Sequence, residues 1–326
     1  MDEVKLIVPS SIANVGLGFD TWSFGTLQPS LKVTYTKTTG DIEIEAKSPY
    51  QPPPGRVLGY AGRQALESFF RQVGIKDGAH ILYEDDNYSV GGTGRSAADA
   101  VGAVISAAII YEKKFTRDEI IALSAKGEPG EHKDNVAGSV NGRFNVVAIS
   151  PSSKTASIDV YEVPDNLGVV VGYSSHKKVE GTEGMRRVTK YPVLAEDFIA
   201  QIGLISAATG ALISGNVNRF LELVWGDRFH EPRRADIGGY GNFTANEFAE
   251  LKKELFDQYG VALNISGAGK NVHFLYNKQQ YKNGIVDAIS PKTLPWFRER
   301  GIEILLKETE IAKKGAYDYA MEHYNL

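Results

Sequence analysis

The segment that most restricts the fold is a glycine-rich run that leads into a long apolar stretch. Residues 89–98 read SVGGTGRSAA, and residues 96–114, SAADAVGAVISAAIIYEKK, are small and apolar on most sides. A helix that is apolar on most sides is buried. We therefore expect residues 96–114 to form a core helix.

The glycine-rich run has two interpretations. Glycine lets the backbone adopt positive φ and approach a ligand closely. The N–H groups at a helix start, with the helix dipole behind them, form an anion site, typically for phosphate. Taken alone, the run fits a tight turn before a core helix at least as well. It is not a Walker A loop, because GxxxxGK[ST] is missing, and it lacks the complete GxGxxG pattern.

Composition excludes several classes of protein and site. The chain has 326 residues, which suits two domains or one large α/β body. With 42% hydrophobic and 23% charged residues it resembles an ordinary soluble globular protein, and its net charge of −4 argues against a nucleic-acid binder. The absence of cysteine excludes disulfides, thiolate nucleophiles and iron–sulfur clusters. The six histidines are scattered and show no HExxH, so a histidine-rich metal site is not expected.

The N-terminal stretch MDEVKLIVPSS is charged, and its apolar part is too short for a signal peptide or a membrane span. No apolar run reaches membrane length. We therefore expect a cytoplasmic protein with no membrane partner.

Strand-like and helix-like segments are mixed irregularly along the chain. VKLIVP, LKVTYTKT, DIEIEA and HILYED in the first third, and RFNVVAIS, LGVVVGYS, VALNIS and HFLY later, are predicted strands. Predicted helices cover residues 57–73, 117–126 (opened by the capping box TRDE), 194–226, 245–259 and 302–324. This irregular mixture favours a two-domain α+β body over a doubly wound sheet. The loop-like segment PSSKTASIDVYEVPDN places the boundary near residue 165, giving domains 1–164 and 165–326.

Five further motifs combine polar residues with glycine, proline or helical spacing. They are PSSIANVGLGFD (9–20), GEPGEHKDNVAG (127–138), the pair Thr182 and Arg186, DRFHEPRR (227–234) and ISGAGKN (265–271). An Asn and an Asp beside a glycine turn can hold a hydroxyl and an ammonium group. Arginines beside a proline can bind a carboxylate bidentately, and a spacing of four places two side chains on one helix face. Each motif alone also fits a turn or a solvated loop.

Together and in this order, the motifs resemble those of the GHMP family of small-molecule kinases, and within it the homoserine kinases. PSSIANVGLGFD is similar to the first motif of that family, and GGTGRSAA stands where the family has a G-L-G-S-S-A-A phosphate loop. HKDNVA, GTEGMR, DRFHEPRR and ISGAG are similar to the later motifs. The resemblance runs from residue 9 to residue 269 and implies a two-domain fold. That fold has an N-terminal domain like ribosomal protein S5 domain 2 and a ferredoxin-like C-terminal α/β domain.

The resemblance implies an ATP-dependent kinase that uses Mg²⁺. The residues implied to bind the ATP phosphates are Gly91, Gly92, Thr93, Gly94, Arg95, Ser96, Ala97 and Gly267. Ser96 and Glu128 are the implied metal ligands, and Glu131 is an alternative to Glu128. One hydroxyl and one carboxylate suit Mg²⁺, which keeps several waters and shares phosphate oxygens.

The resemblance also implies L-homoserine as the acceptor and threonine biosynthesis as the pathway. Asn14 would meet the substrate hydroxyl, and Asn14, Asp134 and Asn135 are the implied catalytic residues. The implied substrate-binding residues are Asn14, Asp20, His132, Asp134, Thr182, Arg186 and Arg234. A site that binds a zwitterion needs an acidic residue at the ammonium end and guanidinium groups at the carboxylate end. No basic residue occurs from residue 6 to residue 20, so we expect in-line attack without a dedicated strong base.

Several positions depart from the family pattern. Arg95 replaces the first Ser of the phosphate loop; a cation there could strengthen nucleotide binding, fill the phosphate pocket or reach an acidic substrate. A GHMP-family kinase for another small hydroxy compound, and a non-catalytic nucleotide-binding homologue, therefore remain alternatives. A homodimer is possible, because Tyr317, Tyr319 and Tyr324 could form a dimer contact or could pack on their own domain.

Overall fold

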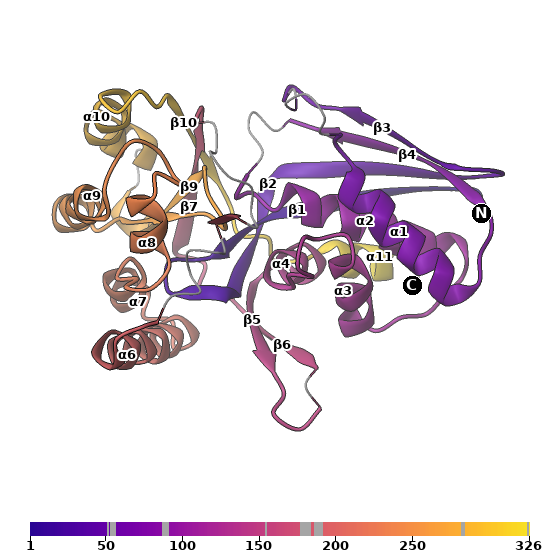
Figure 1. Ribbon diagram of the computed structural model, residues 1–326, viewed down its shortest axis with the longest axis horizontal. Coiled ribbons are helices and arrows are strands. Elements are labelled where there is room, and N and C mark those ends of the chain that lie inside the picture. Colours follow the sequence, from indigo (N-terminus) through magenta and orange to yellow (C-terminus); the bar gives the residue numbers. More distant parts are fainter. Residues whose placement is uncertain are drawn as a thin grey trace. The chain divides into compact units, whose positions relative to one another are not determined.

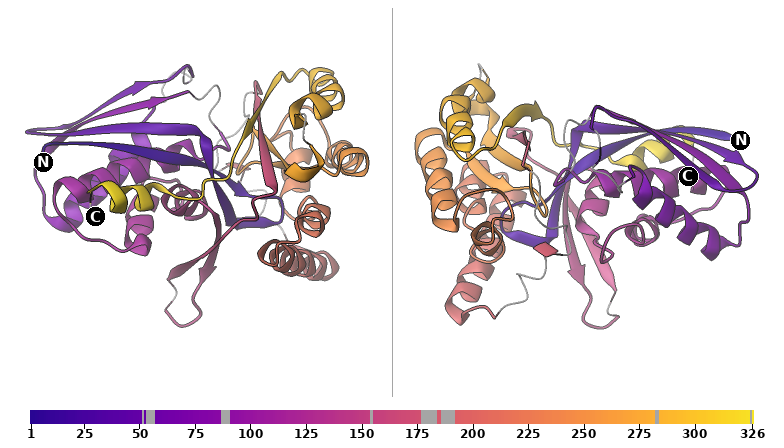
Figure 2. Two further views of the ribbon diagram at one scale, coloured as in Figure 1. Left: turned by 180° about the vertical axis from the view of Figure 1, so that it is seen from behind. Right: turned by 45° about the horizontal axis from the view of Figure 1, so that its top comes forward.

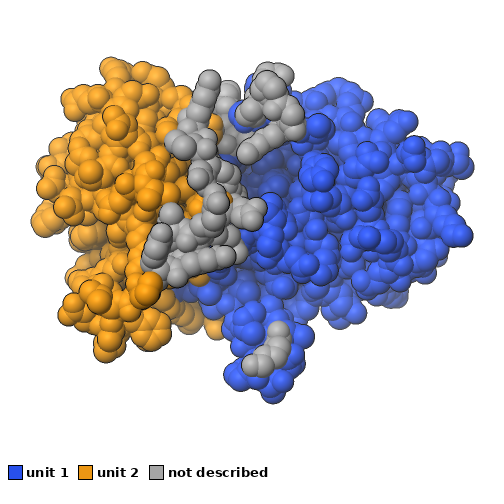
Figure 3. All heavy atoms as spheres, in the orientation of Figure 1, with its two compact units in different colours: residues 1–13, 20–160, 311–326 blue, residues 14–19, 161–310 orange. Residues whose placement is uncertain are grey.

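The computed structural model describes residues 1–50, 52, 57–86, 91–153, 155–176, 184–185, 192–281, 284–324 and 326. The chain forms two compact units, coloured separately in Figure 3. The first unit contains residues 1–13, 20–160 and 311–326, and the second contains 14–19 and 161–310. These units differ from the predicted domains 1–164 and 165–326 in that a short N-terminal segment joins the second unit and the C-terminal tail returns to the first.

The first unit is built on a mixed six-stranded sheet. Its strands are β1 (Glu3–Asn14), β2 (Gly18–Thr38), β3 (Ile42–Lys47), β4 (Gly78–Asp85), β5 (Phe144–Ile149) and β6 (Ala156–Tyr161). The order is β3-β4-β2-β5-β6, and β1 pairs with β2. β3 and β4 are parallel, whereas β2 is antiparallel to β4 and β5. Figures 1 and 2 show the helices of this unit on one face of the sheet.

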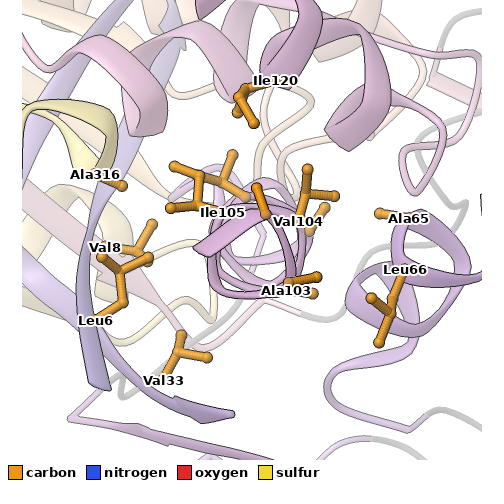
Figure 4. Packing of buried hydrophobic residues seen from close by; sticks show 14 of the residues in the cluster. Leu6, Val8, Val33, Ala65, Leu66, Ala103, Val104, Ile105, Ile120 and Ala316 are labelled. Carbon is orange, nitrogen blue, oxygen red and sulfur yellow. The ribbon is translucent and has the colours of Figure 1, made fainter. Parts of the chain in front are cut away.

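The core helix of the first unit is α2 (Arg95–Ile110), as predicted. Every residue of α2 except Ser96 is buried. Figure 4 shows why a helix apolar around its circumference fits here: its side chains meet Val8 and Val33 of the sheet, Leu66 of α1 (Tyr60–Val73) and Ile120 of α3 (Arg117–Ala125). α4 (Asp134–Asn141) and α11 (Ala316–Tyr324) complete the layer. The predicted capping box is also confirmed, since the side chains of Thr116 and Glu119 cap α3 reciprocally.

The C-terminal tail is a strand followed by a helix. The predicted helix over 302–324 is wrong for its first part, where β10 (Ile304–Thr309) pairs antiparallel with β7 (Leu167–Ser174). Only α11 is helical in the rest of this range. Its tyrosines Tyr317, Tyr319 and Tyr324 pack against the core of the first unit, which is the second of the two roles considered for them. Long-range pairing with β7 decides the strand, and a local periodicity does not contain that information.

The second unit has a four-stranded sheet in the order β10-β7-β9-β8, with β8 at Ala262–Ile265 and β9 at Val272–Asn277. Its helices lie along one face of this sheet (Figure 1). They are α6 (Ala195–Ile213), α7 (Val217–Val224), α8 (Glu231–Asp236), α9 (Ala245–Tyr259), the short 3-10 helix Lys278–Gln280 and α10 (Ile285–Arg298). The helices predicted across 194–226 and 245–259 are thus present.

Among the described residues, one helix is long and apolar enough to cross a membrane. It is α6, with a mean hydropathy of 1.3 and only 17% of the tested window buried. Length and composition are weak evidence for a membrane span, because helices of soluble proteins can pass the same test. Gln201 within α6 is buried and donates hydrogen bonds to Leu17 O (3.0 Å) and Asp227 Oδ1 (2.9 Å) of the same unit.

Candidate active site

The glycine-rich loop ends at an open helix start in the first unit. Gly91, Gly92 and Gly94 have φ of 113°, 91° and 61°, and Gly94 is the N-cap of α2. A Cβ on Gly94 would lie 2.0 Å from Ser11 Oγ, so only glycine fits there without a shift. Ser11 N donates to Thr93 O (3.3 Å), which holds the loop against β1. No side chain of the N-cap occupies the helix start, which is the geometry that binds phosphate.

Ser96 and Glu128 meet at this helix start. Ser96 is the exposed second residue of α2, and its hydroxyl lies close enough to the Glu128 carboxylate to lower the pKa of Glu128. The pKa of Glu128 is raised to about 7, mainly by burial and also by Asp134 and Asp99, against the lowering effects of Ser96 and His132. Glu128 Oε1 is buried and accepts no hydrogen bond within the described part of the chain. A hydroxyl and a carboxylate oxygen in this arrangement fit a Mg²⁺ ion that keeps most of its waters.

The alternative ligand Glu131 is engaged elsewhere. Both of its carboxylate oxygens accept from Lys126 Nζ at 2.7 Å, and half of its side chain is exposed. The structure therefore favours Glu128 over Glu131 as the carboxylate at the helix start. No group of three or more His, Asp or Glu residues that could hold a metal occurs in the described ranges. A site with few protein ligands, as Ser96 and Glu128 would provide, needs no such group.

The residues implied to face the substrate's amino end also come together in the first unit. His132 Nδ1 lies 3.6 Å from Asp20 Oδ1. Asp134 is the buried first residue of α4, and its Oδ1 accepts from Asn135 N (2.8 Å). Two carboxylates and one histidine thus lie in this part of the first unit, and carboxylates suit an ammonium group.

Sequence reasoning missed one residue of this site, Ser11. Its hydroxyl lies 2.9 Å from Asn135 Oδ1 and 3.0 Å from Asn135 O, and it also contacts the position where a Gly94 side chain would begin. Ser11 thus joins β1, the glycine-rich loop and α4. It lies in the motif PSSIANVGLGFD, but that motif drew attention to Asn14 and Asp20 because their chemistry suits a substrate.

In the second unit, Asn14 and Arg234 converge on one carbonyl. Asn14 Nδ2 donates to Gly267 O (2.8 Å), and Arg234 Nη1 donates to the same oxygen (3.3 Å). Arg234 Nε donates to Met185 O (3.0 Å), and its guanidinium lies 4.9 Å from the centre of the Phe19 ring. Asn14 and Arg234 are both buried. Gly267 O therefore orients these two side chains, and the expected phosphate contact of Gly267 stays a prediction.

The helix that carries Arg234 is held by buried carboxylates. Asp227 accepts from the backbone N–H of His230 (3.0 Å) and Glu231 (2.7 Å) at the start of α8. Burial opposes ionisation of Asp227, but His230 and the backbone donors outweigh it and lower its pKa to about 2. Glu231 accepts from Lys252 Nζ (2.6 Å) and from Ile265 N (2.7 Å), which ties α8 to α9 and to the strand before the ISGAGKN turn.

Arg95 does not lie at the surface of the loop. Its side chain is only 4% exposed and is ion-paired with Asp85 and Asp99. Its backbone N–H belongs to the helix start, so a phosphate role for the backbone of Arg95 stays a prediction, whereas the guanidinium is committed to carboxylates. Thr182 and Arg186 lie outside the described residues, and of the GTEGMR motif only Gly184 and Met185 are described.

Comparison with known proteins connects this geometry to a family. Residues 60–143, which include the glycine-rich loop, α2 and α4, match the model of the GHMP kinases N terminal domain. The chain carries a GHMP kinase N-terminal domain. This confirms the resemblance inferred from the sequence motifs.

Relatives extend the likeness over most of the chain. It is 27% identical over 322 residues to the homoserine kinase of Halorubrum lacusprofundi, covering 95% of this chain and 97% of the relative. It is 25% identical over 278 residues to the homoserine kinase of Methanococcus maripaludis, covering 82% and 86%.

Solved structures share the two-domain α+β fold, as predicted. The homoserine kinase of Cytophaga hutchinsonii superposes with a TM-score of 0.79 at 21% identity, covering 97% of this chain and 96% of that one. The mevalonate kinase of L. major superposes with a TM-score of 0.69 at 15% identity, covering 96% and 97%. The fold is therefore that of the GHMP kinases, and the names of the relatives support a small-molecule kinase.

Proposed function

We propose that the protein transfers the γ-phosphoryl group of ATP to the side-chain hydroxyl of L-homoserine, giving O-phospho-L-homoserine for threonine biosynthesis. The observation that carries this proposal is that Ser96 and Glu128 lie together at the open start of α2. This arrangement combines a backbone anion site with a hydroxyl and a carboxylate suited to Mg²⁺. The homoserine kinases among the relatives support the acceptor.

The nucleotide side of the reaction uses the first unit. The N–H groups of the loop Gly91–Gly94 and of the first turn of α2 would bind the phosphates. Ser96 and Glu128 would hold Mg²⁺, which would supply positive charge to offset the charge that develops on the phosphate. Because Gly94 has positive φ and packs against Ser11, the loop presents these N–H groups without needing to rearrange.

The acceptor side uses Asp20, His132 and Asp134 for the ammonium group and Asn14 for the hydroxyl. Arg234, with Arg186 and Thr182, would bind the carboxylate. The bonds from Asn14 and Arg234 to Gly267 O fix the plane of each side chain. Phosphoryl transfer depends mainly on such positioning and on charge stabilisation. We therefore propose that Asn14, Asp134 and Asn135 orient the hydroxyl for in-line attack without a strong base.

The experiment follows ADP release from purified protein with Mg-ATP and L-homoserine, with L-threonine, mevalonate and shikimate in parallel wells. We expect homoserine-dependent ADP formation that needs Mg²⁺ and is strongly reduced in Arg234→Ala. Turnover in another well but not with homoserine would reassign the acceptor and keep the kinase. ATP binding without turnover in any well would favour a non-catalytic homologue.

We also propose a cytoplasmic enzyme that acts on small molecules and forms a homodimer. Light scattering of the eluting peak in size-exclusion chromatography measures the mass directly. A mass near twice the 35.6 kDa of the chain is expected, and a mass equal to that of one chain would contradict the dimer.

A further inference from the structure

The arginine inside the glycine-rich loop is part of a buried ion-pair cluster, here called the Arg95 cluster (Arg95, Asp85 and Asp99). Arg95 Nε lies 2.8 Å from Asp99 Oδ1, and Arg95 Nη1 contacts Asp85 Oδ2. The side chains of Arg95, Asp85 and Asp99 are 4%, 0% and 4% exposed. Buried charges are costly unless they are paired, and Arg95 Nη2 is buried with no hydrogen-bond partner among the described residues.

Each carboxylate of the cluster makes a second bond to a different element of the first unit. Asp85 Oδ1 accepts from Ser48 Oγ (2.8 Å), just beyond the end of β3. Asp99 Oδ2 accepts from Gly59 N (3.2 Å), at the N-cap of α1. One guanidinium thus connects the end of β4, where Asp85 is the last residue, with the first two turns of α2 and the start of α1.

The position of the cluster gives it a relation to the loop. Arg95 is the first residue of α2 and follows Gly94 directly, so its side chain holds the helix start from which the loop's N–H groups project. Gly91, Gly92 and Gly94 provide no side chains of their own to stabilise this conformation, and glycine loses more conformational freedom on ordering than any other residue. A fixed helix start removes part of that entropic cost before a ligand binds.

We propose that Arg95 is a positioning residue for the phosphate loop, holding the start of α2 against the end of β4 through Asp85 and Asp99 without touching the nucleotide. This inference rests on the proposed function, since it assigns nucleotide phosphates to that loop. It also explains why an arginine is accepted in place of a small hydroxyl residue: the side chain leaves the loop and enters the body of the unit.

The direction in which Asp85→Asn changes the affinity for Mg-ATP separates this role from direct phosphate binding. If the guanidinium bound phosphate, Asp85 would compete with the nucleotide, and Asp85→Asn would tighten the affinity for Mg-ATP. If Arg95 positions the loop, Asp85→Asn weakens the affinity, because the helix start loses one of its attachments. Asp85→Asn keeps the shape of the side chain and retains one arginine and one aspartate in the cluster.

The experiment measures the Kd of Mg-ATP and of Mg-ADP by isothermal titration calorimetry for wild type, Arg95→Met, Arg95→Lys, Asp85→Asn and the double variant Arg95→Met/Asp85→Asn. We expect Asp85→Asn and Arg95→Met each to weaken binding by about 10-fold, with the double variant no worse than Arg95→Met, because the two residues act as one unit. Arg95→Lys should recover part of the loss. Steady-state kinetics should show a raised KM for ATP with the KM for homoserine unchanged.

A second readout tests the loop without nucleotide. Hydrogen–deuterium exchange over residues 91–98 should be faster in Asp85→Asn than in wild type, while exchange in α3 is unchanged. Arg117→Met is the matched control, because Arg117 also pairs with an aspartate of the first unit, Asp318 (2.6 Å), away from the loop. It should leave nucleotide affinity and loop exchange as in wild type.

Several outcomes would overturn the proposal. Tighter nucleotide binding by Asp85→Asn would make Arg95 a phosphate ligand, and unchanged affinity with unchanged loop exchange would make the cluster purely structural. If Arg95→Met does not fold, the affinities of Asp85→Asn and Arg95→Lys still decide between a positioning role and direct phosphate binding. Failure of the wild-type protein itself to bind Mg-ATP would instead contradict the proposed function, so the two failures are distinguishable.

Discussion

The carboxylate of Glu128 lies beside the hydroxyl of Ser96 at the start of the most buried helix of the first unit. The two residues lie in different motifs, and the fold brings them together because α2 and the turn after α3 meet there. Burial keeps the pKa of Glu128 near 7, so a cation that displaces its proton would gain a strong ligand in a poorly solvated position. The first prediction follows from this pair.

Glu128→Gln should lower kcat/KM by about 100-fold and raise the Mg²⁺ concentration needed for half-maximal rate, because the amide keeps the shape but loses the charge. Ser96→Ala should act in the same direction. Glu131→Gln is the control, since the Glu131 carboxylate is bound to Lys126. The Mg²⁺ dependence of the Glu131→Gln enzyme should match that of wild type. A Mg²⁺ titration of initial rates measures all three. The assignment fails if Glu131→Gln, and not Glu128→Gln, shifts the curve.

Arg234→Ala should lower kcat/KM for homoserine by about 100-fold or more, because truncating a buried charged group leaves its partners unpaired. Arg234→Lys should recover little, since an ammonium cannot reproduce the planar fork of a guanidinium. Arg233→Ala is the neighbouring control: Arg233 is on the same helix and donates to Pro192 O (2.8 Å). Initial rates at varied homoserine check this, and equal losses in both alanine variants would point to damage to α8 as a whole.

Gly94→Ala should abolish Mg-ATP binding or destabilise the protein by about 2 kcal/mol or more, because alanine at φ 61° is strained and its Cβ meets Ser11 Oγ. Ser11→Ala in the same chain should relieve the contact but not the backbone strain, so it should restore stability only in part. Gly210→Ala in α6 is the matched control, because nothing lies within 4 Å of its added Cβ. Thermal unfolding and calorimetry measure these effects. Full recovery by Ser11→Ala would mean that backbone strain at Gly94 is negligible.

Stability should fall as the pH drops from about 4 to about 2, in part through Asp227. The folded-state pKa of this carboxyl is about 2, below its ordinary value of 3.8, so its contribution is complete above 3.8 and is lost as the pH falls through the lower value. The contribution is on the order of 2 kcal/mol. Denaturant unfolding at pH 7 and at pH 3 should show a larger pH effect in wild type than in Asp227→Asn. An equal pH dependence in both proteins would assign the acid sensitivity to other groups.

The sequence by itself determined the elements whose signals are local. The small apolar residues of 96–114 predicted a buried helix because such a surface is stable only when covered on all sides. Thr116 and Glu119 predicted the start of α3 because a capping box needs only residues three positions apart. The glycines before α2 predicted an open helix start, and the order of the motifs was enough to indicate the family.

Only the tertiary structure decided where the charged side chains go and how the tail runs. The sequence alone suggests that Arg95 is a cation within the glycine-rich loop. Its burial depends on Asp85 and Asp99, which come within reach only after β4 and α2 have packed. Ser11 became part of the site only through its contact with Asn135. Residues 304–309 form a strand because β7 offers an edge to pair with. Pairing and burial depend on residues far apart in the chain, and no local periodicity or spacing records which of them will meet.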